Sequence, residues 1–325
     1  SLPSRHNPGR FEGMISALRH PCGQGKTKTN GHKFKRTRDA ILHARFYLRL
    51  MPRASQSASP LDLQSILDLA LTTVRTASAE LIRLSQSTLE IEYKGDGSPV
   101  TNADLASHHI ISQGLASLDI PVVSEEGGRT PHAQRQNWTR MWLVDPLDGT
   151  NSFIRMRSGY AINVALMETN GQEWLPILGI VALPDLDVMY YGGRGLGTWK
   201  AKLSEGNIVP KPIRSDDDLT PPFDLLISWN ESGTVNDLVA GTVDPTQVRM
   251  RPISGARKFC LVAEGKADIH ARSSGYYEWD CAAGDALLRA QGLAVRDLVT
   301  GRPLAYNGPT LKVGGLIASR IPFAG

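Results

Sequence analysis

The sequence is poor in cysteine and has no long apolar run. Its three cysteines, Cys22, Cys260 and Cys281, show no CxxC or zinc-type spacing, and an odd number cannot all pair with one another. This usage favours a reducing compartment, and the apolar contexts of Cys260 and Cys281 predict buried thiols. No apolar stretch approaches the roughly 18 residues of a membrane-spanning helix, and no Gly-x-Ser-x-Gly elbow is present. The sequence therefore argues against a membrane-spanning protein and against a hydrolase with that serine nucleophile.

The basic charge of the chain is confined to its N-terminal part. The whole chain has a formal net charge of +4, but residues 1–53 hold twelve Lys and Arg against Glu12 and Asp39, so the remaining residues carry −6. We expect residues 1–55 to form a basic, disordered extension, or to be translated sequence upstream of a start at Met51. A mitochondrial-type presequence is the alternative, although its Pro and Gly residues would break an amphipathic helix.

The rest of the chain alternates helical and strand-like patterns. Apolar residues at spacings of three and four predict an amphipathic helix soon after residue 60, and a second helix is expected over 102–118. Short apolar runs bounded by Gly, Pro, Asn and Asp then predict strands, and helical patterns return at 256–264 and 280–291. The run GGRGLG lies between two strand-like segments and predicts a hairpin turn rather than a dinucleotide loop. We therefore expect stacked α and β layers in a mixed α/β fold.

The strongest chemical signal is the segment WLVDPLDGT. An apolar run ends on Asp145, and Asp148 follows three residues later, with Pro146 between them and Gly149 behind. Because proline restricts the residue before it and glycine permits a tight turn, this segment can direct two carboxylates and the Leu147 carbonyl to one point. Such a cluster repels itself unless it holds a cation, and hard oxygen ligands suit Mg²⁺. A plain β-turn in which Asp caps backbone amides is the alternative.

Acidic residues also stand at the ends of three other predicted elements. Glu125 closes the run PVVSEEGG, Asp104 lies in PVTNAD where a helix begins, and Asp280 opens a helix in YEWDCAAGDALL. Acids at four separated element ends predict one site assembled from distant segments, although a helix-capping role is the alternative for Asp280. Asp285, further along the last helix, is expected to be solvated or to support the site without binding metal.

Four segments, GSPVTNAD, VVSEE, WLVDPLDGTNSF and EWDCAAGDALL, resemble in this order the inositol monophosphatase superfamily of metal-dependent, lithium-sensitive phosphatases. Within it, KFCLVAEGKADIHAR beside EWDCAAG is similar to the bacterial 3′(2′),5′-bisphosphate nucleotidases of the CysQ type. The resemblance implies a sugar-phosphatase-like αβαβα sandwich over residues 61–324. Its metal-site half would cover about 61–200 and its substrate-site half about 201–324.

The resemblance also implies a set of metal ligands. Glu125, Asp145 and the carbonyl of Leu147 would hold one Mg²⁺, and Asp145, Asp148 and Asp280 a second. Two or three ions per site are expected, since a weaker third ion near Glu125 is usual in this family. Two ions a few ångströms apart would stabilise the attacking and leaving oxygens of phosphoryl transfer together.

Further roles implied by the resemblance concern catalysis and phosphate binding. Asp104 would accept a proton from the hydroxyl of Thr150, which orients or deprotonates the attacking water. The N–H groups of Gly149 and Thr150 would hold phosphate oxygens, and Asp280 would also contact the substrate.

The substrate side departs from the family pattern at two places. The segment SGARKFC has Gly255 and Ala256 where relatives that act on 3′-phosphoadenosine 5′-phosphate often carry serine, and Asn-Ser follows DGT where the bacterial nucleotidases tend to have Lys-Glu. Lys258 and Arg272 remain as expected contacts of a second phosphate, and Arg257 adds a further charge.

The expected reaction is the Mg²⁺-dependent, Li⁺-inhibited hydrolysis of the 3′-phosphate of 3′-phosphoadenosine 5′-phosphate to AMP and phosphate. An inositol-1-phosphate phosphatase with the same metal site is the nearest alternative, and a polyanion-binding protein acting through the basic N-terminal residues is an alternative of another class. We expect a small phosphate ester as the substrate, no nucleic acid on the folded part, a monomer or homodimer, and a cytoplasmic location. Peripheral membrane contact and organellar targeting by the N-terminal segment stay open.

Overall fold

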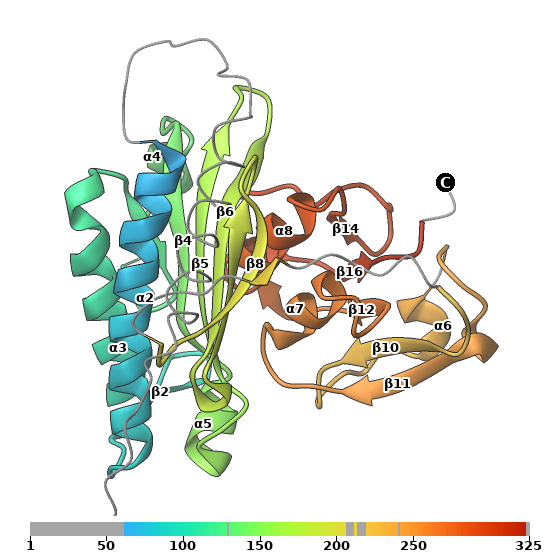
Figure 1. Ribbon diagram of the computed structural model, residues 1–325, viewed down its shortest axis with the longest axis horizontal. Coiled ribbons are helices and arrows are strands. Elements are labelled where there is room, and N and C mark those ends of the chain that lie inside the picture. The colour runs from blue at the N-terminus through green and yellow to red at the C-terminus, as the bar shows by residue number, and fades with distance from the viewer. Residues whose placement is uncertain (1–61, 129, 206–210, 213–218, 240, 323–325) are drawn as a thin grey trace, which may run out of the picture. The chain divides into compact units, whose positions relative to one another are not determined.

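The computed structural model describes residues 62–128, 130–205, 211–212, 219–239 and 241–322 (Figure 1). All of them belong to the unit Pro60–Gly325. The basic extension expected at residues 1–55 lies outside the described residues.

A seven-stranded sheet forms the centre of the described part. β3 runs parallel to β4, and the other neighbouring pairs are antiparallel. The hairpin expected at GGRGLG is confirmed, because the segment joins the last two residues of β7 to the start of β8. In sheet order the strands are β3 (Val122–Ser124), β4 (Arg140–Asp148), β5 (Ala161–Thr169), β6 (Trp174–Leu183), β7 (Val188–Gly193), β8 (Gly197–Lys202) and β9 (Lys211–Pro212).

Two helices, α2 (Leu63–Ser85) and α3 (Asn102–Leu115), cover one face of this sheet (Figure 1). The spacing of Ile66, Ala70 and Val74 places the buried side of α2 against the strands. Between the two helices, a short hairpin pairs β1 (Ile91–Tyr93) with β2 (Pro99–Thr101). The α-helix expected to reach residue 118 ends at 115 and continues as a 3₁₀ turn, Ala116–Leu118.

The opposite face of the large sheet packs on α7 (Arg257–Ala263) and α8 (Glu278–Arg289), which lie between it and a second sheet (Figure 1). These helices approach closely, since a Cβ on Gly284 would lie 2.5 Å from the Cβ of Phe259. Both cysteines of this layer, Cys260 and Cys281, are buried free thiols as expected. The layer therefore holds one of the two large clusters of the core, and the other lies under α2 and α3.

The second sheet has five strands in the described part of the chain. β10 pairs in parallel with both β11 and β12, whereas β16 is antiparallel to β12 and β14. Its outer face is covered by apolar residues around α6 (Val235–Leu238), which completes the expected αβαβα order of layers. In sheet order the strands are β11 (Val248–Pro252), β10 (Phe223–Ile227), β12 (Ile269–Arg272), β16 (Leu316–Ser319) and β14 (Val295–Asp297).

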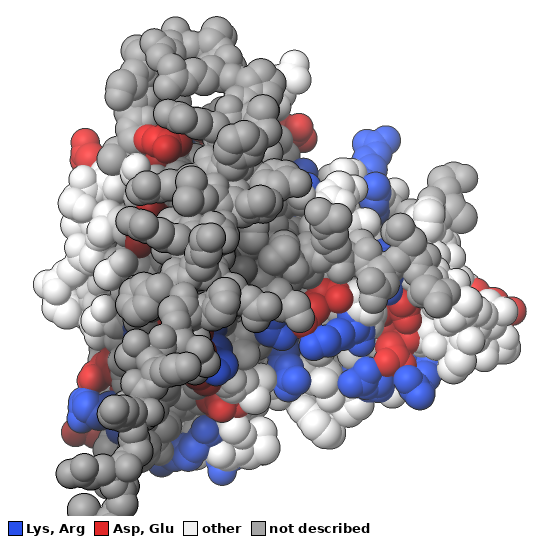
Figure 2. Space-filling view, in the orientation of Figure 1, with Lys and Arg blue, Asp and Glu red and all other residues white. Residues whose placement is uncertain are grey.

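The remaining described elements are short. They are α4 (His132–Arg135), α5 (Thr150–Met156), and the pair β13 (Tyr276–Tyr277) and β15 (Lys312–Val313). None of the helices among the described residues combines the length and the apolar character needed to cross a membrane. On the face shown in Figure 2, Lys and Arg side chains of the small-sheet region lie beside acidic ones. Ion pairs within the small sheet join Asp224 to Arg249 and to Arg251.

Candidate active site

The end of β4 directs two carboxylates out of the large sheet. Its register against β5 is broken between Asp145 and Asp148, so the intervening residues leave the ladder. The N–H of Leu147 donates to Oδ1 of Asp145 at 3.0 Å, which fixes that side chain inside the turn. Gly149 follows with φ of 91°, and a Cβ there would lie 3.0 Å from the carbonyl oxygen of Gly159. Glycine is thus required at this position by both its backbone angle and its close neighbour.

Carboxylates from three elements converge beside this turn. Ligand atoms of Glu125, Asp145 and Asp280 all lie within 4.8 Å of one another, close enough to hold one metal ion. Glu125 follows β3, and its N–H donates to the carbonyl of Val144 on β4 at 3.0 Å. Asp280 lies in the first turn of α8 and accepts from the N–H of Tyr277 at 2.7 Å. Helix capping and a place in the site, the two alternatives for Asp280, are therefore both observed, since it caps α8 and also faces the cluster.

Burial makes the charge of this cluster costly. The pKa of Asp145, which is 1% exposed, is raised well above its usual range by burial and by the negative charges of Glu125, Asp148 and Asp280. The pKa of Asp280 is raised in the same way, by burial and by Asp148 and Glu125. Oxygen donors that repel one another in a low-dielectric site fit a divalent hard cation such as Mg²⁺ or Ca²⁺. The oxygen donors of this cluster therefore suit a divalent metal ion.

Lys94 supplies one positive charge at the edge of the cluster. Its Nζ donates to Glu125 at 2.8 Å and to Glu126 at 2.7 Å. Burial opposes the charge of Lys94, but the two carboxylates outweigh it and raise its pKa. Sequence reasoning did not find this lysine, because nothing in the spacing of the β1–β2 hairpin indicates that it reaches β3.

Asp148 is held by the loop that precedes α7. Its Oδ2 accepts from the N–H of Ala256 at 2.5 Å. Gly255 has φ of 62°, and a Cβ on it would lie 3.0 Å from the same oxygen. The glycine that replaces the serine expected from relatives therefore lets this backbone approach the carboxylate closely.

A hydrogen-bonded chain links Thr150 to the start of α3. Oγ1 of Thr150 donates to Oδ1 of Asp104 at 2.9 Å and lies 3.2 Å from the carbonyl oxygen of Leu147. Oδ2 of Asp104 accepts from both the N–H and the hydroxyl of Thr101, at 2.8 and 2.6 Å. Burial raises the pKa of Asp104, and the Thr101 donors oppose that shift. Thr101 went unnoticed in the sequence, although the pattern Thr-x-x-Asp is the signature of a capping box.

The two expected contacts of a second phosphate lie on the small-sheet side of the site. Lys258, 1% exposed, donates from Nζ to the carbonyls of Gly255 at 2.7 Å and Ile253 at 3.2 Å. Burial lowers its pKa to about 8, against the attraction of Asp148. Arg272 donates from Nη1 to Asn230 at 3.0 Å. Both cations are thus oriented by neighbours before any ligand is present.

Asp285 is not solvated, so that part of the expectation is wrong. It is completely buried on α8 and accepts from the N–H of Val295 at 2.7 Å, from Arg289 at 2.8 Å and from the hydroxyl of Tyr306 at 3.0 Å. These partners join α8 to the segment around β14, and Asp285 therefore fastens the core.

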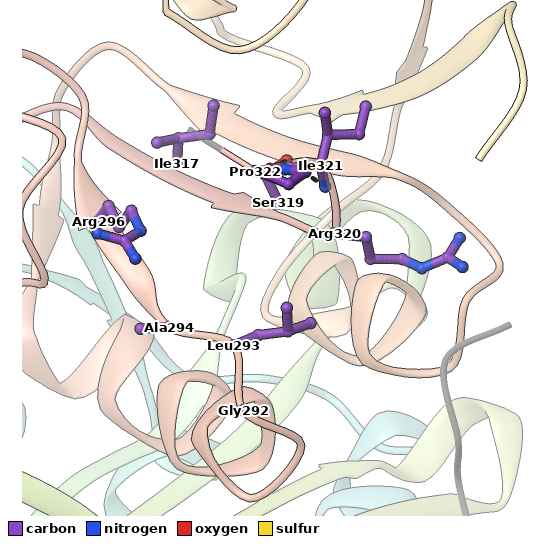
Figure 3. Close-up of a pocket in the computed structure, with 9 residues that line it drawn as sticks. All are labelled: Gly292, Leu293, Ala294, Arg296, Ile317, Ser319, Arg320, Ile321 and Pro322. Atoms are coloured by element: carbon purple, nitrogen blue, oxygen red, sulfur yellow. Dashed lines mark hydrogen bonds between the residues drawn. The ribbon is translucent and has the colours of Figure 1, made fainter. Parts of the chain in front are cut away.

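A cavity of about 200 Å³ lies elsewhere, between the end of α8 and β16 (Figure 3). It contains none of the residues expected in the site from the sequence. Its lining is mainly backbone and apolar side chains with two arginines, so it offers no carboxylate cluster. The residues are Gly292, Leu293, Ala294, Arg296, Ile317, Ser319, Arg320, Ile321 and Pro322.

Comparisons with known proteins place this site in context. The model of the inositol monophosphatase family matches residues 62–322. The chain is 38% identical over 237 residues to the 3′(2′),5′-bisphosphate nucleotidase CysQ of Salmonella typhimurium, which covers 72% of this chain and 90% of that protein. It is 37% identical over 246 residues to CysQ of Escherichia coli strain K12, covering 74% and 94%. The crystal structure of CysQ from Bacteroides thetaiotaomicron matches with a TM-score of 0.64 at 27% identity, over 79% of this chain and 98% of that one.

Proposed function

Because the chain belongs to the inositol monophosphatase family, we propose that it hydrolyses the 3′-phosphate of 3′-phosphoadenosine 5′-phosphate to AMP and phosphate with the help of Mg²⁺. The similarity to CysQ nucleotidases over nine-tenths of their length supports this substrate. One observation supports hydrolysis by an activated water most directly. Thr150 follows immediately after the WLVDPLDG turn, which supplies Asp145 to the carboxylate cluster, and its hydroxyl is hydrogen-bonded to Asp104.

We assign the metal ligands to the acids around the turn. Glu125, Asp145 and the carbonyl of Leu147 would hold one Mg²⁺, and Asp145, Asp148 and Asp280 another, with two or three ions in all. Bound ions would neutralise the phosphate and make a nearby water a better nucleophile. The proximity of Glu125, Asp145 and Asp280 supports the assignment. Asp148 is not among these three acids, but its charge acts on Asp145 and Asp280, and its hydrogen bond to Ala256 fixes its position.

The protein's own part in the reaction falls to Thr150 and Asp104. Since the Thr150 hydroxyl donates its hydrogen bond to Asp104, a lone pair of its oxygen is free to accept from a water. Asp104 has a raised pKa and a rigid hydrogen-bonded position, which suit a group that would accept the Thr150 proton as that hydroxyl takes one from the attacking water. The first N–H groups of α5, at Gly149 and Thr150, lack intrahelical acceptors and would hold phosphate oxygens.

Recognition of the second phosphate is assigned to Lys258 and Arg272. Lys258 uses two of its three donors on backbone carbonyls, and the action of its charge on Asp148 supports a role beside the reacting phosphate. Arg272 ends β12 on the same side of the fold. A dianion between them would be bound by charge-assisted hydrogen bonds. Asp280, which lies in the first turn of α8, would also contact the substrate.

The direct test compares phosphate release from 3′-phosphoadenosine 5′-phosphate and from inositol 1-phosphate, with Mg²⁺ alone and with added Li⁺. We expect faster phosphate release from the nucleotide than from inositol 1-phosphate. This release should stop when Mg²⁺ is chelated and should be inhibited by Li⁺. Faster release from inositol 1-phosphate would support the metal site but assign a different substrate to it. Gly255 and Ala256, which stand where nucleotide-specific relatives often have serine, are the observation that favours this second candidate.

Two variants distinguish the phosphatase proposal from the polyanion-binding alternative. If the chain acted as a polyanion-binding protein through residues 1–53, a variant without them would lose function while Asp145→Asn kept it. The phosphatase proposal expects the reverse, with full turnover in the shortened chain and almost none in Asp145→Asn.

A further inference from the structure

The loop after β10 borders the substrate side of the site. β10 runs parallel to β11 and β12, so the segments that leave these three strands emerge at one edge of the small sheet. The backbone of Ile253, just past β11, donates to the carbonyl of Ile227 at the end of β10 at 2.9 Å. Two residues beyond Ile227 stands Trp229, and three beyond Ile253 stands Ala256, which binds Asp148. The carboxyl edge of parallel strands is where α/β sheets bind ligands.

This loop is fastened to the segment that carries Arg272. Oδ1 of Asn230 accepts from Nη1 of Arg272 at 3.0 Å. The carboxylate of Glu231 accepts from the hydroxyl of Ser273 at 2.5 Å and from its N–H at 3.3 Å. Glu231 also holds its own loop, through the N–H of Gly233 at 2.8 Å. Trp229 therefore belongs to an ordered loop and precedes Asn230, the residue that binds the cation assigned to the second phosphate.

The indole of Trp229 is nonetheless left in water. It is 72% exposed, whereas Leu225 and Leu226 on the preceding strand β10 are completely buried. An indole is the largest apolar side chain and gains most from a flat partner that covers it. Its exposure on a loop held by hydrogen bonds is not explained by packing within the described residues.

We propose that Trp229 is a stacking platform for the purine base of the substrate, an inference that rests on the proposed nucleotidase activity. A nucleoside bisphosphate consists of two phosphates, a ribose and a base. Metal ions on the acids around Asp145 would hold the scissile phosphate, and Lys258 and Arg272 would hold the second, so the base is the part with a flat, π-bearing surface that has no partner assigned. Stacking on an aromatic side chain suits any base face. A saturated ring such as inositol offers no such face, so Trp229 favours a nucleotide over inositol 1-phosphate.

The test uses Trp229→Ala and Trp229→Phe, with Val299→Ala as the control variant at an exposed position in the turn after β14. Initial rates are measured for 3′-phosphoadenosine 5′-phosphate and for ribose 3,5-bisphosphate, which keeps both phosphates but lacks the base. Trp229→Ala should raise KM for the nucleotide about tenfold, the factor expected from one lost stacking contact, with kcat unchanged. KM for the base-free compound should not move, Trp229→Phe should recover most of the affinity, and Val299→Ala should match the wild type.

A second readout does not depend on turnover. The product AMP should quench the tryptophan emission of the wild type in the presence of Mg²⁺, and this quenching should be lost in Trp229→Ala. An equal KM in Trp229→Ala and wild type, or an equal rise for both compounds, would overturn the stacking role while leaving the nucleotidase proposal intact. Absence of nucleotide turnover in the wild type would overturn the nucleotidase proposal and the stacking role together.

Discussion

Thr150 and Asp104, 46 residues apart in the chain, are joined by a hydrogen bond of 2.9 Å that ties the start of α5 to the first turn of α3. The other oxygen of Asp104 is held twice by Thr101. Because every bond to this carboxylate comes from a short side chain or the backbone, its orientation is set before substrate binds. Preorganised groups of this kind act mainly on the chemical step.

Replacing Thr150 by Val should slow the chemical step while preserving the fold. The isosteric methyl group neither donates to Asp104 nor accepts from water, so kcat should fall by roughly 10² to 10⁴. Thr150→Ser keeps the hydroxyl and should retain most activity. The measurement is kcat with saturating Mg²⁺, beside the thermal midpoint of both variants. A Val variant with near-normal kcat would show that the hydroxyl takes no part in the reaction.

Asp145→Asn should abolish the stabilisation of the protein by Mg²⁺. In the wild type, Mg²⁺ at about 100 times its dissociation constant should stabilise the fold by ~2.7 kcal/mol, which raises the melting temperature by roughly 5–10 °C. The variant should lose this shift together with turnover. In a chelator it should melt no lower than the wild type, because the raised pKa of Asp145 shows that its charge is unfavourable in the metal-free cluster. A Mg²⁺-dependent shift that persists in Asp145→Asn would contradict the ligand assignment.

Gly255→Ala should impair catalysis as well as stability. The left-handed backbone angle alone costs about 1–2 kcal/mol for a residue with a Cβ, and here the Cβ also meets Oδ2 of Asp148 at 3.0 Å. Gly171→Ala is the matched control, since Gly171 has φ of 90° but no neighbour within 4 Å. Both variants should melt at a lower temperature, whereas only Gly255→Ala should need more Mg²⁺ for half-maximal activity. Equal Mg²⁺ requirements would mean that the contact with Asp148 has no bearing on metal binding.

The candidate site could be inferred from the sequence where it depends on local chemistry. Asp145, Asp148 and Gly149 were singled out because a strand end followed by Pro and Gly has few conformations open to it. Asp104 and Asp280 were singled out because acids at helix starts have a physical reason to be there. Their convergence was an inference from four such ends, and the structure places Glu125, Asp145 and Asp280 within reach of one ion.

Contacts between segments that are far apart in the chain could not be predicted from the sequence. The contact of Asp148 with Ala256 and the hydrogen bond of Asn230, next to Trp229, with Arg272 follow from the parallel pairing of β10 with β11 and β12, which no local pattern encodes. Asp285 was misjudged for a related reason. A helix with one wet face can keep an aspartate in water, but α8 is enclosed between two sheets and buries nearly its whole circumference.

The second phosphate gives the last prediction. Lys258→Met and Arg272→Met remove one charge each while keeping an apolar stem, and each should raise KM for 3′-phosphoadenosine 5′-phosphate by roughly 10- to 100-fold, the loss of one charge-assisted hydrogen bond. Lys266→Met is the control, because Lys266 is a surface lysine of the same region that pairs with Glu264. KM for inositol 1-phosphate, which has a single phosphate, should change little in all three. A parallel rise for both substrates would instead assign the two cations to the scissile phosphate, since that group is the one that the substrates share.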